Sequence, residues 1–216
     1  MCKFLLFTSV VENVGKRQLV NNLAYALASY NQKVAVLTLD HHREESREQL
    51  EKESIKTFDR PDGLPSEQFN FILVNLPLSV FLSDVSGQYF LVLTPLSNVI
   101  SASKTFVDSL NVNSTIQIIV NMVSRHKESE VYGYKIESLM GAPVAYEIPY
   151  DKVVSKAEAA KQLAVKAYPW SAYSQSILKM AALVSDLSYL PPPNYMVWKI
   201  FQNLPTAFSR FILRRC

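Results

Sequence analysis

The residues best suited to chemistry lie in one loop near the N-terminus, where Gly15 and Lys16 follow an apolar run and precede a helical pattern. A phosphate-binding loop needs glycines so that backbone N–H groups can surround the phosphates. It also needs a lysine for the β- and γ-phosphates and a Ser or Thr hydroxyl for Mg²⁺. The glycine and the lysine are present, but Arg17 stands where the hydroxyl is expected. The pair alone does not define such a loop, so the surrounding secondary-structure elements must show whether a phosphate-binding loop is present.

Those elements form a regular alternation. Residues 4–11 are a short apolar run rich in β-formers, and residues 19–30 carry apolar side chains at helical spacing. Residues 34–39 form a second apolar run. A strand, a loop, a helix and a strand within about 35 residues make a βαβ unit. We therefore expect parallel strands joined by a right-handed crossover, with the loop at the end of the first strand.

The alternation continues along the chain. Further strands are expected at residues 71–76, 89–94, 116–120 and 143–148, and further helices at residues 97–110, 131–140 and 171–187. The stretch 41–68 is highly charged, which predicts a solvated helix leading into a proline-rich loop at 59–65. Buried strands separated by amphipathic helices indicate an α/β fold, with a mostly parallel sheet flanked by helices on both faces.

Composition divides the chain into three parts. Residues 1–187 form the expected α/β domain. Residues 188–193 form a linker, because three consecutive prolines, Pro191 to Pro193, favour an extended connection. Residues 194–216 carry the pattern of a basic amphipathic helix, and they form the C-terminal tail.

The order of these motifs resembles the deviant-Walker P-loop ATPases, the family of MinD, ParA and the proteins that position pili, flagella and secretion machines. Residues 11–18 align without gaps with the family's K-G-G-V-G-K-T-T loop, and residues 22–28 with its N-L-A-x-A-L-A helix. The other matching segments are residues 34–40, the Walker B strand at 71–77, the strand end at 118–123 and the turn at 148–151. The resemblance implies a P-loop NTPase-like fold of MinD/ParA type.

Several positions depart from what the resemblance implies. The family's signature lysine, which reaches the partner's phosphates in its dimers, is Val11 here, and the Mg²⁺-binding threonine is Arg17. The Walker B aspartate is Asn75, and of the family's D-x-D pair only the second residue remains, as Asp40. Phosphoryl transfer depends on positioning and charge stabilisation by such groups. We therefore predict a catalytically degenerate pseudo-ATPase that has no catalytic residues and is not an enzyme.

The resemblance still leaves room for residual nucleotide binding. Glu12 replaces a loop glycine, and its carboxylate is expected to repel phosphates in a partly desolvated pocket. No cofactor is expected beyond weakly bound ATP or ADP without Mg²⁺. The residues that the resemblance assigns to such binding are Gly15, Lys16, Asn121, Pro149 and Asp151. In the alternative interpretation, Asn121 only caps a strand end and Arg17 fills the phosphate site with its own charge.

The C-terminal tail forms the second informative region. Its apolar residues fall on one helical stripe and its basic residues lie largely opposite, which is typical of a helix lying in the headgroup plane of a membrane. Pro205 would bend or split such a helix. The residues assigned to membrane or partner contact are Trp198, Phe201, Phe208, Phe211, Arg210 and Arg214. The alternatives are that the stripe docks on a protein partner or on the chain's own body.

Charge and cysteine content limit the partners and the cellular compartment that the sequence predicts. Residues 187–216 carry four basic residues and no acidic one, so subtracting them from the net charge of +3 leaves about −1 on the rest. A body without a positive excess argues against nucleic acid as a partner. Cys2 and Cys216 form no disulfide framework, and no apolar run approaches the roughly 18 residues of a membrane span. We expect a cytoplasmic protein, or one peripheral at the inner face of the cell membrane.

No metal site is expected, because His41 and His42 have no further ligands nearby in the sequence. The predicted function is that of a MinD/ParA-like positioning, scaffolding or recruitment factor for a bacterial membrane-associated assembly. Such an assembly would be a secretion, pilus, flagellar or polysaccharide-export machine, and its proteins would be the partners. Two alternatives stay open: an active or weakly active ATPase with an unusual loop, and a nucleotide-independent binding subunit of a multiprotein complex.

Overall fold

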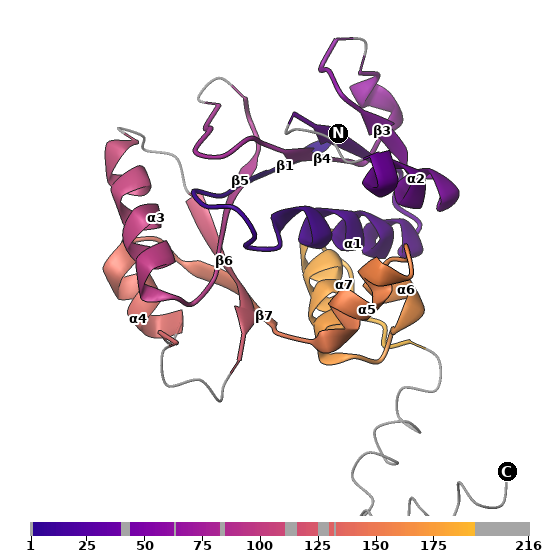
Figure 1. Ribbon diagram of the computed structural model, residues 1–216. Helices are drawn as coiled ribbons and strands as arrows, with labels where there is room; N and C mark the ends of the chain where they lie inside the picture. The colour runs from indigo at the N-terminus through magenta and orange to yellow at the C-terminus, as the bar shows by residue number, and fades with distance from the viewer. Residues whose placement is uncertain are drawn as a thin grey trace, which may run out of the picture.

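The computed structural model describes residues 2–39, 44–62, 64–82, 85–110, 116–124, 130–131 and 133–192 of the 216-residue chain (Figure 1). The strands are β1 (Lys3–Thr8), β2 (Val34–Thr38), β3 (Lys56–Phe58), β4 (Phe71–Asn75), β5 (Gln88–Leu93), β6 (Ile116–Val123) and β7 (Val144–Pro149). The helices are α1 (Lys16–Ser29), α2 (Glu44–Lys52), α3 (Ser97–Ser109), α4 (Gly133–Met140), α5 (Lys152–Ala159), α6 (Ala164–Ala167) and α7 (Ala172–Val184), with a 3-10 turn at Ser66–Gln68.

The strands form one sheet in the order β3-β2-β4-β1-β5-β6-β7, and the pairings between these strands are parallel. β1 lies between β4 and β5, so the chain builds outward from β1 in two directions. In such a sheet, ligands bind outside the carboxyl ends of the strands, at the point where the direction changes. This point lies at the end of β1, where the glycine and lysine of the loop stand.

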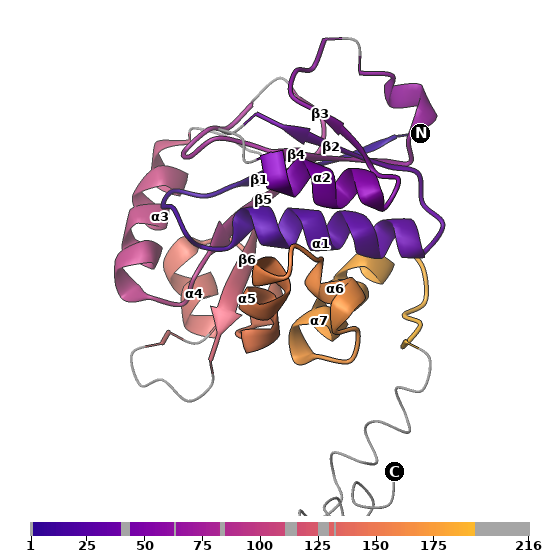
Figure 2. The same ribbon diagram turned by 45° about the vertical axis from the view of Figure 1, so that its right-hand side comes forward.

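Helices cover both faces of the sheet. The β1–α1–β2 connection moves toward the β3 edge, whereas the β5–α3–β6 connection moves toward the β7 edge. Right-handed crossovers in opposite directions put their helices on opposite faces. Figures 1 and 2 show α1 on one face together with α5, α6 and α7, and α3 with α4 on the other. The predicted α/β fold is confirmed.

The core lies between the sheet and these helices. All five residues of β4 are buried, as expected of a central parallel strand with helices on both faces. On the neighbouring strands β1 and β5, the rings of Phe7 and Phe90 stack with centroids 5.1 Å apart. The central strands thus coincide with the continuous apolar runs from which they were predicted.

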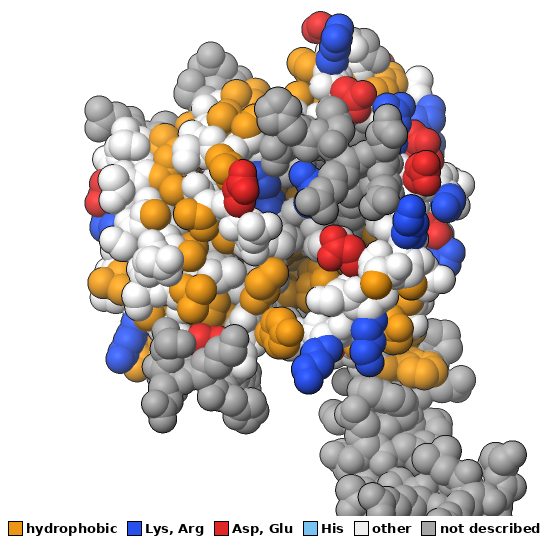
Figure 3. All heavy atoms as spheres, in the orientation of Figure 1, with side chains coloured by type: hydrophobic (Ala, Val, Ile, Leu, Met, Phe, Trp, Pro, Cys, Tyr) orange, Lys and Arg blue, Asp and Glu red, His pale blue; other side chains and the backbone are white. Residues whose placement is uncertain are grey.

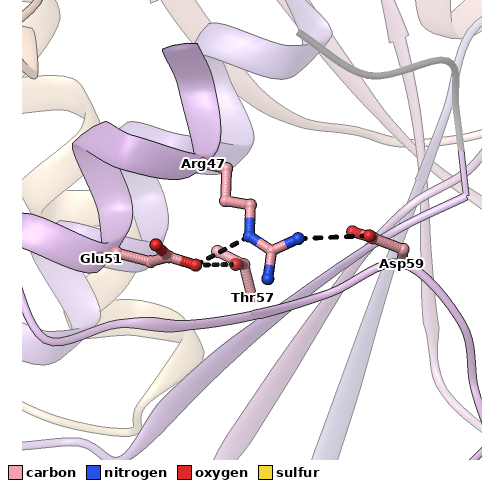
Figure 4. Close-up of polar contacts among 4 residues, drawn as sticks. All are labelled: Arg47, Glu51, Thr57 and Asp59. Atoms are coloured by element: carbon pink, nitrogen blue, oxygen red, sulfur yellow. Dashed lines mark hydrogen bonds and ion pairs between the residues drawn. The ribbon is translucent and has the colours of Figure 1, made fainter. Parts of the chain in front are cut away.

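Some elements were not predicted. The charged stretch contains the expected helix, α2, but β3 follows it and pairs with β2 at one edge of the sheet. Polar contacts connect α2 with β3 and the residue that follows it (Figure 4). The Arg47 guanidinium on α2 contacts Glu51 at 2.8 Å and Asp59 at 3.3 Å. The Thr57 hydroxyl of β3 donates to Glu51 at 3.0 Å. The hydrogen bond from Arg47 is the main reason that the pKa of Glu51 lies below its usual value.

α5 and α6 were also missed. α5 begins where the Asp151 carboxylate accepts a hydrogen bond of 3.1 Å from the Val153 amide, so this residue serves as a helix N-cap. α6 has only one turn, too few residues to show a periodic pattern. α7 ends at Val184, three residues before the predicted end, and Asp186 adopts a left-handed backbone with φ 57°.

After α7 the chain packs back on α1. The Leu190 amide donates to the Tyr30 hydroxyl at 3.2 Å, and the Tyr189 hydroxyl donates to the side chain of Gln175. The predicted C-terminal tail, 194–216, lies outside the described residues. In the part that the structure describes, no helix combines the length and apolar character needed to cross a membrane.

Charged side chains are distributed unevenly over the face drawn in Figure 3. Acidic and basic groups crowd the side that carries α2 and β3, whereas the side over α3 and α4 carries few. α4 also exposes apolar side chains, since Tyr134 and Leu139 are 68% and 53% exposed.

One buried amide joins α1 to α6. Asn22 is fully buried in α1; its Oδ1 accepts a hydrogen bond of 2.9 Å from the Val165 amide, and its Nδ2 donates to the Gln18 carbonyl at 2.7 Å. The Val165 amide lies in the first turn of α6, where no residue of the helix itself can accept its hydrogen bond. Asn22 therefore fixes the position of α6 beside α1.

We expect Asn22→Ala to lower the free energy of unfolding by about 1–3 kcal/mol, because it leaves the Val165 amide buried without its acceptor. Urea unfolding followed by circular dichroism measures the change. Lys33→Ala is the matched control, since the Lys33 side chain is exposed and should change stability little. Equal stabilities of the two variants would contradict the role given to Asn22.

Candidate functional site

The loop from β1 to α1 brings backbone amides to the carboxyl edge of the sheet. Gly15 adopts the left-handed conformation, with φ 76° and ψ 15°, and directly precedes α1. Its carbonyl accepts the first helical hydrogen bond, from the Leu19 amide at 3.0 Å. The first turn of α1 contains no acidic residue and no side chain caps it. The amides of this turn and the positive end of the helix dipole are therefore arranged as in an anion site.

Lys16 adds a buried cation to this turn. Its side chain is 6% exposed, and its Nζ donates to the carbonyl of Leu76, the residue that follows β4. The lysine thus reaches from α1 to the end of the strand next to β1. A phosphate oxygen is a stronger acceptor for an ammonium group than a neutral carbonyl, so a bound phosphate could replace this contact.

The loop also rests on the end of β6. Asn121 is 3% exposed, and its Nδ2 donates to the Val14 carbonyl at 2.8 Å. The pairing of β6 with β7 shifts register between Val120 and Val123, and Met122 adopts a left-handed backbone with φ 61°. This irregularity bends β6 where Asn121 meets the loop. The Asn121 side chain therefore holds the β1–α1 loop against the end of β6.

A cavity of about 850 Å³ lies beneath the loop. Its size falls within the range of about 300–1,000 Å³ that small-molecule sites occupy. The predicted site residues that line it are Val11, Gly15, Lys16, Arg17, Asn121, Pro149 and Asp151. The structure thus brings together both ends of the predicted nucleotide site, from α1 at one end and from the β7–α5 turn at the other.

Two predicted positions are not among the lining residues. Asn75, at the end of β4, is 1% exposed, and its Oδ1 has no hydrogen-bond partner among the described residues. Asp40 lies outside the described residues, as do His41 and His42. Over the described ranges, no group of three His, Cys, Asp or Glu side chains is placed to hold a metal ion.

Glu12 lies where its charge matters less than the sequence implied. Glu12 and Asn13 are exposed at the tip of the loop, although both border the cavity. Water screens an exposed carboxylate far more than a desolvated one. The repulsion expected between Glu12 and bound phosphates is therefore reduced by solvent.

The sequence did not reveal the contributions of α2, α5 and α7 to the cavity. Gln49 of α2 lines it, as do Ser155 and Glu158 of α5 and Tyr173 of α7. Tyr173 is 3% exposed, and its hydroxyl has no hydrogen-bond partner in the described part of the chain. Burial raises the pKa of this phenol well above its usual value, so it stays a neutral donor. Helical spacing identified Tyr173 only as one residue of a helix.

The chain matches the family model of the CobQ/CobB/MinD/ParA nucleotide binding domain over residues 5–165. Among solved structures it is similar to MinD from Pyrococcus horikoshii in complex with Mg-ADP. The TM-score is 0.67 at 21% identity, and the match covers 85% of this chain and 96% of that one. No curated protein matches the chain significantly in sequence.

Two other solved structures show the same similarity. The MinC:MinD cell division protein complex from Aquifex aeolicus matches with a TM-score of 0.71 and 16% identity, over 87% of this chain and 97% of that one. A ParA family ATPase from Chlorobium tepidum matches with a TM-score of 0.67 and 15% identity, over 83% and 97%. At these identities the structural matches show the shared fold.

These findings correct one prediction. The expectation that the chain is not an enzyme is wrong, because the matched family model is that of the CobQ/CobB/MinD/ParA nucleotide binding domain and the similar solved structures include a ParA family ATPase. The prediction treated the loss of single side chains, such as those at Val11 and Arg17, as the loss of the whole site. Instead the glycine turn, the buried Lys16 and the cavity are all present.

The contact between the loop and β6 has a measurable consequence at Gly15. A Cβ atom there would lie 2.5 Å from Asn121 Nδ2 and 2.9 Å from Met122 Cε, in addition to the strain of φ 76°. Gly141 has a similar φ of 64°, but a Cβ atom there would meet nothing within 4 Å. Comparing alanine substitutions at the two glycines therefore distinguishes the cost of backbone strain from the cost of steric overlap.

We expect both Gly15→Ala and Gly141→Ala to lose roughly 1–2 kcal/mol from left-handed strain. Gly15→Ala should lose at least about 1 kcal/mol more, because its methyl group overlaps Asn121. Chemical unfolding of the two variants beside the unchanged protein measures both terms. If Gly141→Ala is as destabilising as Gly15→Ala, the close packing of the loop on β6 is not a significant constraint.

Proposed function

The chain belongs to the CobQ/CobB/MinD/ParA nucleotide-binding domain family, and on that premise we propose that it is a nucleotide-dependent recruitment factor. It binds ATP or ADP in the cavity beneath the β1–α1 loop and turns ATP over slowly. Its nucleotide state controls the recruitment or positioning of a membrane-associated protein assembly.

The observation that carries this proposal is the buried Lys16 at the N-terminus of α1. The lysine, the left-handed Gly15 and the uncapped first turn of the helix point toward one end of a cavity large enough for a nucleotide. A buried ammonium group beside the backbone amides at a helix N-terminus favours a multiply charged anion over a neutral ligand. This end of the cavity suits the phosphates.

The other end of the cavity suits a base. Pro149, Tyr150 and Val154 line it beside Asn121 and Asp151, which gives a mainly apolar surface with a few polar groups. The turn is held in place, because the Tyr150 amide donates to the Val123 carbonyl at 2.9 Å and Asp151 caps α5. The side-chain carbonyl of Asn121 is an acceptor that could pair with the amino group of adenine. The Pyrococcus horikoshii neighbour, solved with Mg-ADP, supports the choice of an adenine nucleotide.

Slow turnover follows from the side chains that surround the phosphates. Val11 carries no charge at the position that the resemblance assigns to a lysine, and Arg17 replaces a hydroxyl. Catalysis of phosphoryl transfer rests almost entirely on positioning and on such charges. We propose that the chain works through the difference between its nucleotide states rather than through rapid turnover.

The recruitment role rests on two further observations. The MinD of Aquifex aeolicus is found in complex with a protein partner, MinC, which supports a protein assembly as the target for this chain as well. The C-terminal tail, which lies outside the described residues, combines apolar and basic residues in the pattern of a membrane-surface helix. Secretion, pilus, flagellar and polysaccharide-export machines are membrane assemblies of the kind proposed.

We expect Lys16→Ala to weaken ATP and ADP binding by roughly tenfold to a hundredfold, because it removes a charge-assisted contact to the phosphates. Its ATP turnover should fall to the level of the buffer. Fluorescent nucleotide titration and phosphate release measure the two effects. Lys33→Ala, which removes an exposed lysine outside the cavity, should behave as the unchanged protein.

If the unchanged protein and Lys16→Ala bind nucleotide equally, Lys16 does not mark the phosphate site. If the unchanged protein binds no nucleotide at all, the chain is a nucleotide-independent binding subunit. In either case the proposed function is wrong.

We expect the intact chain to float with vesicles of acidic phospholipid, and a chain ending at residue 193 to remain behind. Each aromatic side chain contributes at most about 1.5–3 kcal/mol on full burial, and each cation contributes about 1 kcal/mol near an acidic leaflet. Phe208→Asp should reduce flotation more than Ser209→Asp, because only Phe208 lies on the apolar stripe.

Equal effects of the two substitutions would mean that charge alone drives attachment. If the intact chain does not float, the C-terminal tail serves a protein partner instead of a membrane. Neither result bears on nucleotide binding, so the two parts of the proposed function are tested separately.

A further inference from the structure

Mg²⁺ is the metal that nucleotide sites of this fold imply, and the residues that the structure describes at the two ligand positions do not fit it. In P-loop proteins Mg²⁺ is held by a Ser or Thr hydroxyl at the start of the helix, by an aspartate at the end of a neighbouring strand and by the phosphates. In this chain, Arg17 stands at the hydroxyl position and Asn75 at the carboxylate position. Both protein ligands are therefore changed.

Arg17 replaces a ligand by a cation. It is the second residue of α1, follows Lys16 directly, and lines the cavity with its side chain half-buried. A guanidinium group has five donors and no acceptor, so it cannot coordinate a metal ion. Its fixed positive charge also repels a divalent cation at the same place.

The end of β4 offers little to a metal ion. Asn75 is neutral, is 1% exposed and is not one of the residues that line the cavity. The carbonyl of the next residue, Leu76, accepts a hydrogen bond from Lys16 Nζ, so an ammonium group already lies close to the end of β4. Mg²⁺ usually needs at least one carboxylate in such a site.

The carboxylates that line the cavity are not grouped for a metal either. They belong to Glu12 at the exposed tip of the loop, to Asp151 and to Glu158. Asp151 is engaged as the N-cap of α5. In the described parts of the chain, no three candidate ligands come together.

We infer that this site binds the phosphates of a free nucleotide without Mg²⁺, with Arg17 supplying the positive charge that the metal ion supplies elsewhere. The inference rests on the proposed nucleotide binding and specifies which form of the nucleotide is bound. The Lys16 and Arg17 side chains and the backbone amides at the start of α1 together surround the phosphates. The planar guanidinium can donate two parallel hydrogen bonds to one phosphate, which an ammonium group cannot do.

This arrangement reverses the usual effect of Mg²⁺. The metal ion neutralises part of the phosphate charge, so a site built from protein cations loses attraction for the metal complex. The free nucleotide should therefore bind at least as tightly as its Mg²⁺ complex. In a site that holds Mg²⁺, chelating the metal weakens binding.

The experiment is a titration of the intact chain with a fluorescent ADP analogue, once with EDTA and once with excess Mg²⁺. The affinity in EDTA should equal or exceed that in Mg²⁺. Arg17→Thr, which restores the hydroxyl, should lose roughly tenfold in EDTA, because a charge-assisted contact disappears. The double variant Arg17→Thr with Asn75→Asp restores both ligand types and should bind more tightly in Mg²⁺ than in EDTA.

Arg60→Thr is the matched control, because Arg60 is exposed and does not line the cavity. Its affinity should equal that of the unchanged chain in both buffers. Arg17→Lys keeps the charge without the planar donors, should lose less than Arg17→Thr, and provides a second variant if Arg17→Thr does not fold. Thermal melting of each variant checks folding.

Two results would overturn the inference while leaving nucleotide binding intact. One is binding by the unchanged chain in Mg²⁺ but not in EDTA. The other is an affinity in EDTA that neither Arg17→Thr nor Arg17→Lys changes. Absence of binding in both buffers would instead show that the proposed function itself is wrong, and the inference would fail with it.

Discussion

The buried ammonium group of Lys16 links the two elements on which the site depends, α1 and the end of β4. A buried charge is unfavourable unless polar groups satisfy it, and the Leu76 carbonyl provides such a group. That carbonyl is within reach only because β4 inserts between β1 and β2, so the strand order of the sheet determines what the lysine can touch. The same strand order leaves the carboxyl end of β1 at the change of direction, where the loop turns into the helix. The position of the candidate anion site is thus a consequence of the topology as well as of the loop sequence.

Much of this fold can be predicted from the sequence, because buried parallel strands appear as continuous apolar runs and their helices as amphipathic ones. β4 and β5 were located in this way. β3 was not, because its three residues lie at the edge of the sheet, exposed or only half-buried, and carry no periodic pattern. α6, with four residues, is likewise too short for helical spacing. The insertion of β4 between β1 and β2 is invisible in any local pattern, since it depends on contacts between segments far apart in the chain.

The site was predictable as a set of residues but not as a set of contacts. The motif order brought Gly15, Lys16 and Asn121 into one group, and all three line one cavity. The sequence could not show that Asn121 holds the loop through the Val14 carbonyl, because 107 residues separate the two partners. It also could not show that Glu12 is exposed, and without that fact the charge of Glu12 was judged too damaging. Side-chain identity alone therefore underestimated how much of the site's geometry is present.

α7 runs from the cavity to the opposite edge of the sheet. Tyr173, near its start, lines the cavity, whereas its far end lies beside the first residues of β1, since Lys3 contacts Asp186 at 2.6 Å. A helix of 13 residues spans about 20 Å, so the chain leaves the domain at the edge of the sheet opposite to the loop. There the Leu190 amide bonds to Tyr30 at the end of α1. α1 and α7 are thus the elements that connect the cavity with the opposite edge of the sheet.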